Sequence, residues 1–217
     1  MSSQTRQRQP VAVVACGALA LHLRAIARRR RLPIDIHPLS PALHNRPERI
    51  APAVQDALER LDRQYERIAV AFADCGTRGQ LDEALAERGI ARLSGDTCYD
   101  VLALEEVRQA LAEEPGTYFL TDFLVRTFER SVVRPLGLDR YPELRDAYFG
   151  NYRRVLWLAQ RPTLSLRDRA RAAAERLGLP LEERLVGEAG LERQLEELVS
   201  SRARPAALPP RKKGRTL

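Results

Sequence analysis

The sequence predicts an α/β fold built on a mostly parallel sheet. Short apolar segments alternate with helical segments along most of the chain, and turns containing glycine or proline separate many of them. Such alternation is typical of parallel strands joined by right-handed helical crossovers. A hydrophobic fraction of 44% is sufficient to build a core.

The first half of the chain starts with the apolar run from Val11 to Ala15, which we interpret as a buried strand before a turn at Gly17. Apolar residues recur at spacings of three and four between Ile50 and Leu61, which indicates an amphipathic helix. Gly89 ends another helix. Strands are expected at residues 11–15, 34–37, 68–74 and 91–93, and helices at 18–30, within 48–68, at 81–88 and at 99–114.

The second half repeats the alternation. Asp122 can cap a helix that follows a strand-like segment, and Gly178 ends a later helix. The segment 153–160 is apolar and ambiguous, and we interpret it as a strand. Strands are expected at 117–121, 153–160 and 181–186, and helices at 122–133, 142–148, 164–177 and 191–199.

The chain of 217 residues fits one large domain or two small ones. We expect an α/β portion at 10–114 that carries all the cysteines, and a second α/β portion at 115–199 packed on the first. The alternation allows the two portions to form two lobes. Residues 1–9 and 200–217 are expected to be disordered, because their polar or basic, proline-containing sequences bury little apolar surface.

The positive charge belongs to the tails. The formal net charge is +7, and residues 201–217 contribute six basic residues while Arg6 and Arg8 contribute two more, which leaves 7 − 8 = −1 for residues 11–200. We therefore do not expect nucleic-acid binding and interpret the tail as solvated, with weak contact to anionic surfaces as the alternative. No apolar run reaches the roughly 18 residues of a membrane span. The N-terminus lacks a signal-peptide pattern, and we expect a cytoplasmic protein.

The three cysteines share one kind of position. Cys16 and Cys75 each follow an apolar run, and Cys98 follows a short apolar segment and its turn. In open α/β sheets ligands bind outside the carboxyl ends of the strands, so the three thiols are expected to meet in one crevice. The following helices point their N-termini at this crevice and favour thiolates.

Three thiolates without a fourth cysteine suit a four-iron, four-sulfur (4Fe–4S) cluster with one open iron. They equally suit zinc with a water or substrate in the fourth position. The alternatives are plain packing, because cysteine is often buried as a small hydrophobe, and a nucleophilic or redox thiol. No two cysteines form a C-x-x-C pair, so local spacing does not decide between these possibilities.

Other polar residues are expected around the cysteines. His44 and Asp74 are the candidate acid–base residues. Arg46 is a candidate anion clamp, because a guanidinium binds carboxylate or phosphate well. Asn45 is a candidate substrate contact, although a helix cap is the alternative and the preferred interpretation. Two further candidate substrate-binding residues are Thr77 and Asp122, and for Asp122 a helix cap is again the preferred alternative.

A set of motifs resembles the family known as domain of unknown function 1638, over about residues 10–192. These motifs are ACGAL at 15–19, LHNRP at 43–47, DCGT at 74–77, CY at 98–99, PGTYFLTDFL at 115–124, LGLD at 136–139 and YFGNY at 148–152. The resemblance implies that Cys16, Cys75 and Cys98 belong to family motifs and form a shared site.

The chain departs from the family pattern at one point. The resemblance leads us to expect a histidine before the third cysteine, where this chain has Thr97. We expect an enzyme, a lyase or a group- or sulfur-transferase, that acts on a small, anionic substrate at a cluster or metal held by the cysteines. The alternative is a non-catalytic accessory of a partner enzyme, with a structural zinc or merely packed cysteines.

Overall fold

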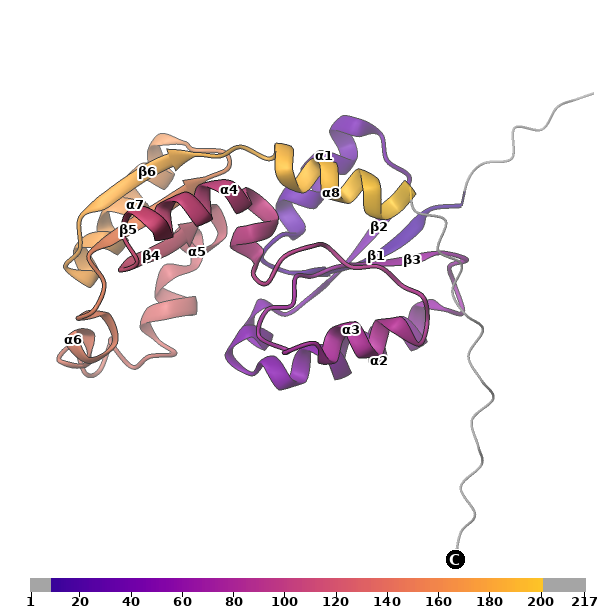
Figure 1. Cartoon of the computed structure of the whole chain (residues 1–217), viewed down its shortest axis with the longest axis horizontal. Helices are drawn as coiled ribbons and strands as arrows, with labels where there is room; N and C mark the ends of the chain where they lie inside the picture. The colour runs from indigo at the N-terminus through magenta and orange to yellow at the C-terminus, as the bar shows by residue number, and fades with distance from the viewer. Residues whose placement is uncertain (1–8, 201–217) are drawn as a thin grey trace, which may run out of the picture.

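Two parallel sheets of three strands each form the framework of the computed structural model, which describes residues 9–200. This confirms the predicted α/β fold (Figure 1). The predicted disordered segments fall almost wholly outside the described residues. The first sheet has the order β2-β1-β3, and the second has the order β4-β5-β6. The strands are β1 Val11–Cys16, β2 Ile34–Leu39, β3 Ile68–Ala71, β4 Thr117–Thr121, β5 Arg154–Ala159 and β6 Leu181–Leu185.

The first sheet lies between two pairs of helices (Figure 1). Helices α1 and α8 cover one face, and α2 and α3 cover the other. Strand β1 is central and buried along its whole length, which explains its continuous run of valine, alanine and cysteine. The helices that cover the first sheet are α1 Ala20–Arg30, α2 Ile50–Leu61, α3 Gln80–Ala86 and α8 Ala189–Ser200.

The second sheet buries its two faces differently. Leu120 and Trp157 belong to one hydrophobic cluster with residues of α5 and α7, whereas Phe119 and Leu156 join the core of the first sheet. This alternation along β4 and β5 follows from the two-residue period of strands. The helices here are α5 Asp122–Phe128, α6 Leu144–Phe149 and α7 Leu164–Leu177; α5 continues through a π-helical turn, η3 Glu129–Val133.

Two helices join the lobes. Helix α4, Cys98–Glu113, packs against both β4 and α8. Helix α8 returns from the second sheet to the first, where Glu192 pairs with Arg29 and Arg30 of α1. Residue 114 lies between the two sheets, and α8 packs in the core of the first sheet although it follows the second sheet in the chain. The sequence did not reveal this, because an amphipathic helix does not specify which sheet covers its apolar face.

Most expected elements lie where the sequence pattern predicts them, with three local differences. The strand expected at residues 91–93 is reduced to one isolated β-bridge, between Arg92 and Val70 of β3. Strand β3 ends at Ala71, before the predicted end at Asp74. The expected loop after β2 contains two short 3-10 helices, η1 Pro41–Asn45 and η2 Pro47–Arg49. Within residues 9–200, no helix is long and apolar enough to cross a membrane.

We expect the return of α8 to be a main source of stability. Leu195 is fully buried (0% exposed) in the core of the first lobe, whereas Leu164 is 80% exposed. Replacing Leu195 with alanine leaves a cavity and should lower the free energy of unfolding by about 2–5 kcal/mol. The matched Leu164→Ala change should alter it by less than about 0.5 kcal/mol. Urea denaturation measures both, and similar costs for the two variants would contradict the assignment of α8 to the core.

Candidate functional site

The three cysteines lie beside the carboxyl ends of β1 and β3, a place that we call the mouth of the site. Cys16 is the last residue of β1, Cys75 lies in the turn after β3, and Cys98 is the first residue of α4. Because β1 and β3 are parallel neighbours, their carboxyl ends share one edge of the sheet. All three cysteines are free thiols.

The Cys16 turn fits closely against the segment after β2. The backbone N–H of Gly17 donates to the Leu39 carbonyl at 3.0 Å. A Cβ atom at Gly17 would lie 2.6 Å from that oxygen and 2.9 Å from Cδ of Pro41, so only glycine fits here. The glycine therefore allows η1 to approach the Cys16 thiol.

The Cys75 turn is organised by a carboxylate. Asp74 accepts hydrogen bonds from the backbone N–H groups of Gly76, Arg78 and Gly79 and from the Thr77 hydroxyl. Cys75 adopts a left-handed conformation with φ of 53°, which is uncommon for a residue with a side chain. The conformation costs free energy, and the four hydrogen bonds to Asp74 offset it.

Backbone hydrogen bonds join the Cys75 turn to the segment before Cys98. Asp74 N donates to the Gly95 carbonyl at 3.1 Å, and Cys75 N donates to the Asp96 carbonyl at 2.7 Å. Thr97 then caps α4 in a capping box with Asp100. At the position where the family resemblance led us to expect histidine, this chain therefore has a helix cap, which fixes Cys98 at the first helical position.

Burial dominates the electrostatics of the three thiols, so the expectation that helix N-termini would favour thiolates is wrong. Burial raises the pKa of Cys16 to about 11, against hydrogen bonds from the backbone of Ala18 and Leu19. Burial, followed by repulsion from Cys16, raises the pKa of Cys75 to about 12. Burial raises the pKa of Cys98 further, with added repulsion from both Cys16 and Cys75. Each pair of thiols repels when ionised, and a bound cation would remove this cost.

His44 faces the first of these thiols. Its Nε2 atom lies 3.9 Å from Sγ of Cys16, and its Nδ1 atom lies 3.0 Å from the Pro41 carbonyl oxygen. A carbonyl only accepts hydrogen bonds, so Nδ1 carries the proton and Nε2 presents its lone pair toward the sulfur. Histidine and cysteine thus meet from segments that are 28 residues apart.

Three thiols and one imidazole gather here, but their arrangement is not that of a metal site. Thiolates and a neutral imidazole are the ligands that zinc and iron–sulfur centres use. Within residues 9–200, no group of three or more His, Cys, Asp or Glu side chains is arranged to hold a metal ion.

Other predicted site residues have structural partners instead. The Asp74 carboxylate is engaged by its own turn, and the buried Thr77 is one of its donors. Asp122 is fully buried (0% exposed) and accepts hydrogen bonds from Trp157 Nε1 and from the backbone of Gln160 and Arg161. These side chains thus have structural partners, and the acid–base role of Asp74 and the substrate contacts of Thr77 and Asp122 stay predictions.

The loop residues predicted beside His44 are in a different situation. Asn45 and Arg46 are exposed and lie next to the mouth. Asn45 does not cap a helix, because the N-cap of η2 is Arg46 and that of α2 is Arg49, and neither helix has a side-chain cap. Both residues therefore remain candidates for contact with a substrate.

Arg92 is a residue that sequence reasoning missed. Its guanidinium donates to the carbonyls of Leu93 and Gly95 and forms an ion pair with Asp82. It also lowers the pKa of Cys75 slightly, against the larger effect of burial. Arg92 holds the segment before Cys98 in place. No motif marked it, because its partners are backbone carbonyls and the acid Asp82 on α3.

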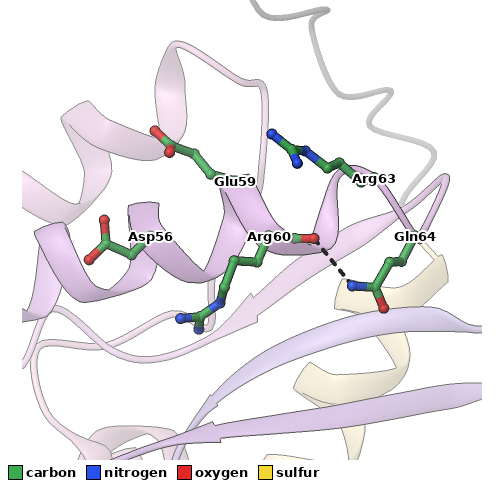
Figure 2. Close-up of a pocket in the computed structure, with 5 residues that line it drawn as sticks. All are labelled: Asp56, Glu59, Arg60, Arg63 and Gln64. Atoms are coloured by element: carbon green, nitrogen blue, oxygen red, sulfur yellow. Dashed lines mark hydrogen bonds between the residues drawn. The ribbon is translucent and has the colours of Figure 1, made fainter.

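The surface hollow in Figure 2 lies away from this mouth. It is lined along the outer side of α2 and the turn after it by Asp56, Glu59, Arg60, Arg63 and Gln64. The side chains are mixed in charge, and Gln64 Nε2 donates to the Arg60 carbonyl at 3.5 Å. None of the cysteines contributes to its lining, and we assign it no role.

The raised thiol pKa values predict low reactivity in the metal-free protein. Only the thiolate is nucleophilic, so at pH 8 iodoacetamide should modify native Cys75 at least about 100-fold more slowly than the same cysteine in denaturant. The rate should rise with pH toward the pKa of about 12. Mass spectrometry of tryptic peptides gives the rate for each cysteine. Equal rates in the native and denatured protein would contradict the buried environment.

Asp74 should give the protein a specific pH dependence. Burial tends to raise the pKa of Asp74, but hydrogen bonds from Thr77, Gly79, Arg78 and Gly76 outweigh it and lower the pKa below the ordinary 3.8. The ionised form therefore stabilises the fold above that pH, and this stabilisation is lost as the pH falls through the lowered pKa. Asp74→Asn should cost about 1–3 kcal/mol at pH 7 and progressively less below about pH 4.

Urea denaturation of the native protein and Asp74→Asn between pH 7 and pH 3 measures this difference. The exposed Asp56 on α2 supplies the control, and Asp56→Asn should change stability by less than about 0.5 kcal/mol at each pH. A penalty for Asp74→Asn that is constant across the range would show that the carboxylate charge does not hold the turn.

Comparison with known proteins places the chain in a family without giving it an activity. A family model described as a protein of unknown function (DUF1638) matches residues 38–195, well over half of the chain. The matched span includes His44, Cys75 and Cys98, while Cys16 lies before it. No curated protein and no solved structure matches the chain. The chain belongs to the DUF1638 family.

Proposed function

We propose that this protein is a metal- or iron–sulfur-dependent enzyme whose centre is held by Cys16, Cys75 and Cys98. The observation that carries the proposal is geometric: Cys16 ends β1, Cys75 lies in the turn after the neighbouring strand β3, and that turn is hydrogen-bonded to the segment before Cys98. Packing alone is the competing explanation, because Cys16 belongs to the buried core and Cys75 and Cys98 pack against it. A cation is what converts such a cluster of thiols into thiolate ligands.

The proposed substrate is a small anion. A 4Fe–4S cluster with one iron not bound by cysteine, or alternatively a zinc ion, supplies a Lewis-acid position when bound. In the proposal Arg46 attracts the anion, and Asn45 offers an amide beside it. His44 holds or releases a proton at Nε2, and its contact with the Pro41 carbonyl orients the ring. Lyase or group- and sulfur-transfer chemistry fits these roles.

The alternative is a non-catalytic accessory of a partner enzyme, with a structural zinc or packed cysteines. One observation favours this alternative. Backbone hydrogen bonds alone join the Cys75 turn to the segment before Cys98, so these two segments are held together by the fold itself. In either case we propose a reducing, cytoplasmic location, because the cysteines are free thiols.

Metal analysis after anaerobic purification tests the proposal. We expect a brown protein with about four irons per chain, or a colourless protein with about one zinc. Each of the variants Cys16→Ser, Cys75→Ser and Cys98→Ser should lose most of the metal and, if the centre is catalytic, most of the activity.

The accessory alternative makes a different prediction, in which serine variants lose stability while no ligand changes the spectrum of the native protein. Native protein that holds neither iron nor zinc would rule out the proposed enzyme.

A further inference from the structure

The two sheets end at strands β2, β3, β4 and β6, and three of these edges carry a feature that hinders further pairing. Strand β3 forms its bridge to Arg92, and the Phe119 carbonyl in β4 accepts a hydrogen bond from the Tyr99 hydroxyl. In β2, Pro38 has no N–H, and the N–H of Ile34 already donates to the turn before the strand. Features of this kind keep a sheet edge from pairing with another chain.

The edge of β6 lacks such a feature. The N–H of Val155 in β5 donates to the Pro180 carbonyl at 2.9 Å, and hydrogen bonds to one neighbouring strand recur at every second residue. The even-numbered residues of β6 therefore bond to β5, and the N–H and C=O groups of Leu181, Glu183 and Leu185 point away from it. No hydrogen bond among residues 9–200 occupies these groups. Figure 1 shows β6 as the outermost strand of the second sheet.

We propose that two copies of this chain pair through their β6 strands, in antiparallel orientation, about a twofold axis at Glu183. The inference goes beyond the proposed function and does not rest on it. In this register Leu181 lies opposite Leu185 of the second copy, and Glu183 lies opposite Glu183 of the second copy. Each of these pairs exchanges both of its backbone hydrogen bonds, because the groups that point away from β5 face each other. The second sheets of the two copies then form one continuous sheet.

The side chains of β6 match in this register. Leu185 is 71% exposed on the single chain, and cross-strand contact with Leu181 of the second copy covers it. On the opposite face of the sheet, Glu182 lies beside Arg184 of the second copy, and the twofold axis repeats this pair of opposite charges. Charged residues on an edge strand commonly prevent pairing, but here their order favours pairing with an identical strand.

The one pair of like charges in this register is compensated within each chain. The Glu183 carboxylate accepts hydrogen bonds from Nε and Nη2 of Arg167 on α7, at 2.9 and 2.8 Å. A bidentate guanidinium is a strong partner for a carboxylate. The two Glu183 side chains therefore meet at the axis as ion pairs, which reduces their repulsion.

Sedimentation equilibrium of the full chain in a reducing buffer tests the interface. At about 100 µM, where an interface of micromolar affinity is largely formed, we expect a mass of twice 24.5 kDa. Glu183→Pro removes an N–H that points away from β5, so the pairing of β6 with β5 should persist while dimerisation weakens at least about tenfold. Circular dichroism checks that the variant folds.

A charge swap gives a second readout, which also decides the matter if the proline variant does not fold. Glu182→Arg and Arg184→Glu should each dimerise at least about tenfold more weakly than the native chain, because like charges then lie opposite each other. An equimolar mixture of these two variants should form a heterodimer, since opposite charges again face each other at both positions. Glu59→Arg makes the same charge change at an exposed position of α2 and should leave the dimer intact.

A native chain that is monomeric at this concentration would overturn the proposal. So would a folded Glu183→Pro variant that dimerises with native affinity, or charge variants that dimerise as well alone as in the mixture. None of these results bears on the three-cysteine site, because its metal content is measured separately.

Discussion

Parallel pairing of β1 with β3 is the constraint on which the site depends. It places Cys16 and the turn carrying Cys75 at the same edge of the sheet. Any shift of this register by one residue would turn the side chains to opposite faces and separate the thiols. The buried valines and alanines of β1 fix the register, so the core of the first lobe and the proposed centre depend on the same residues.

Hydrogen bonds fix the turns that follow the strands of the first sheet. Asp74 organises the turn of Cys75, and that turn binds the backbone just before Cys98. The capping box of Thr97 and Asp100 then sets the start of α4, whose Tyr99 hydroxyl donates to the Phe119 carbonyl in β4. The candidate site is thus linked to both sheets, although its cysteines come from the first lobe and from α4.

Much of this arrangement was predictable from sequence. Apolar runs such as residues 11–15 specify buried strands, and cysteines at their ends fall at the ligand-binding edge of a parallel sheet. The part played by Asp74 was not predictable, because a carboxylate after a strand serves equally as an acid–base group or as a turn acceptor. The preferred interpretation of Asp122 as a helix cap is wrong, because Thr121 caps α5. The closeness of His44 and Cys16 was also beyond sequence reasoning, since it depends on how Gly17 lets the turn after β2 approach.

The central claim is that three distant cysteines share one mouth, and trivalent arsenic tests it without any metal. Phenylarsine oxide bonds two sulfurs only when they are neighbours. The native chain and each single cysteine-to-serine variant should therefore bind about one arsenical by mass spectrometry, while variants that retain one cysteine should bind none stably. A folded variant retaining two of Cys16, Cys75 and Cys98 that fails to bind the reagent would contradict the account.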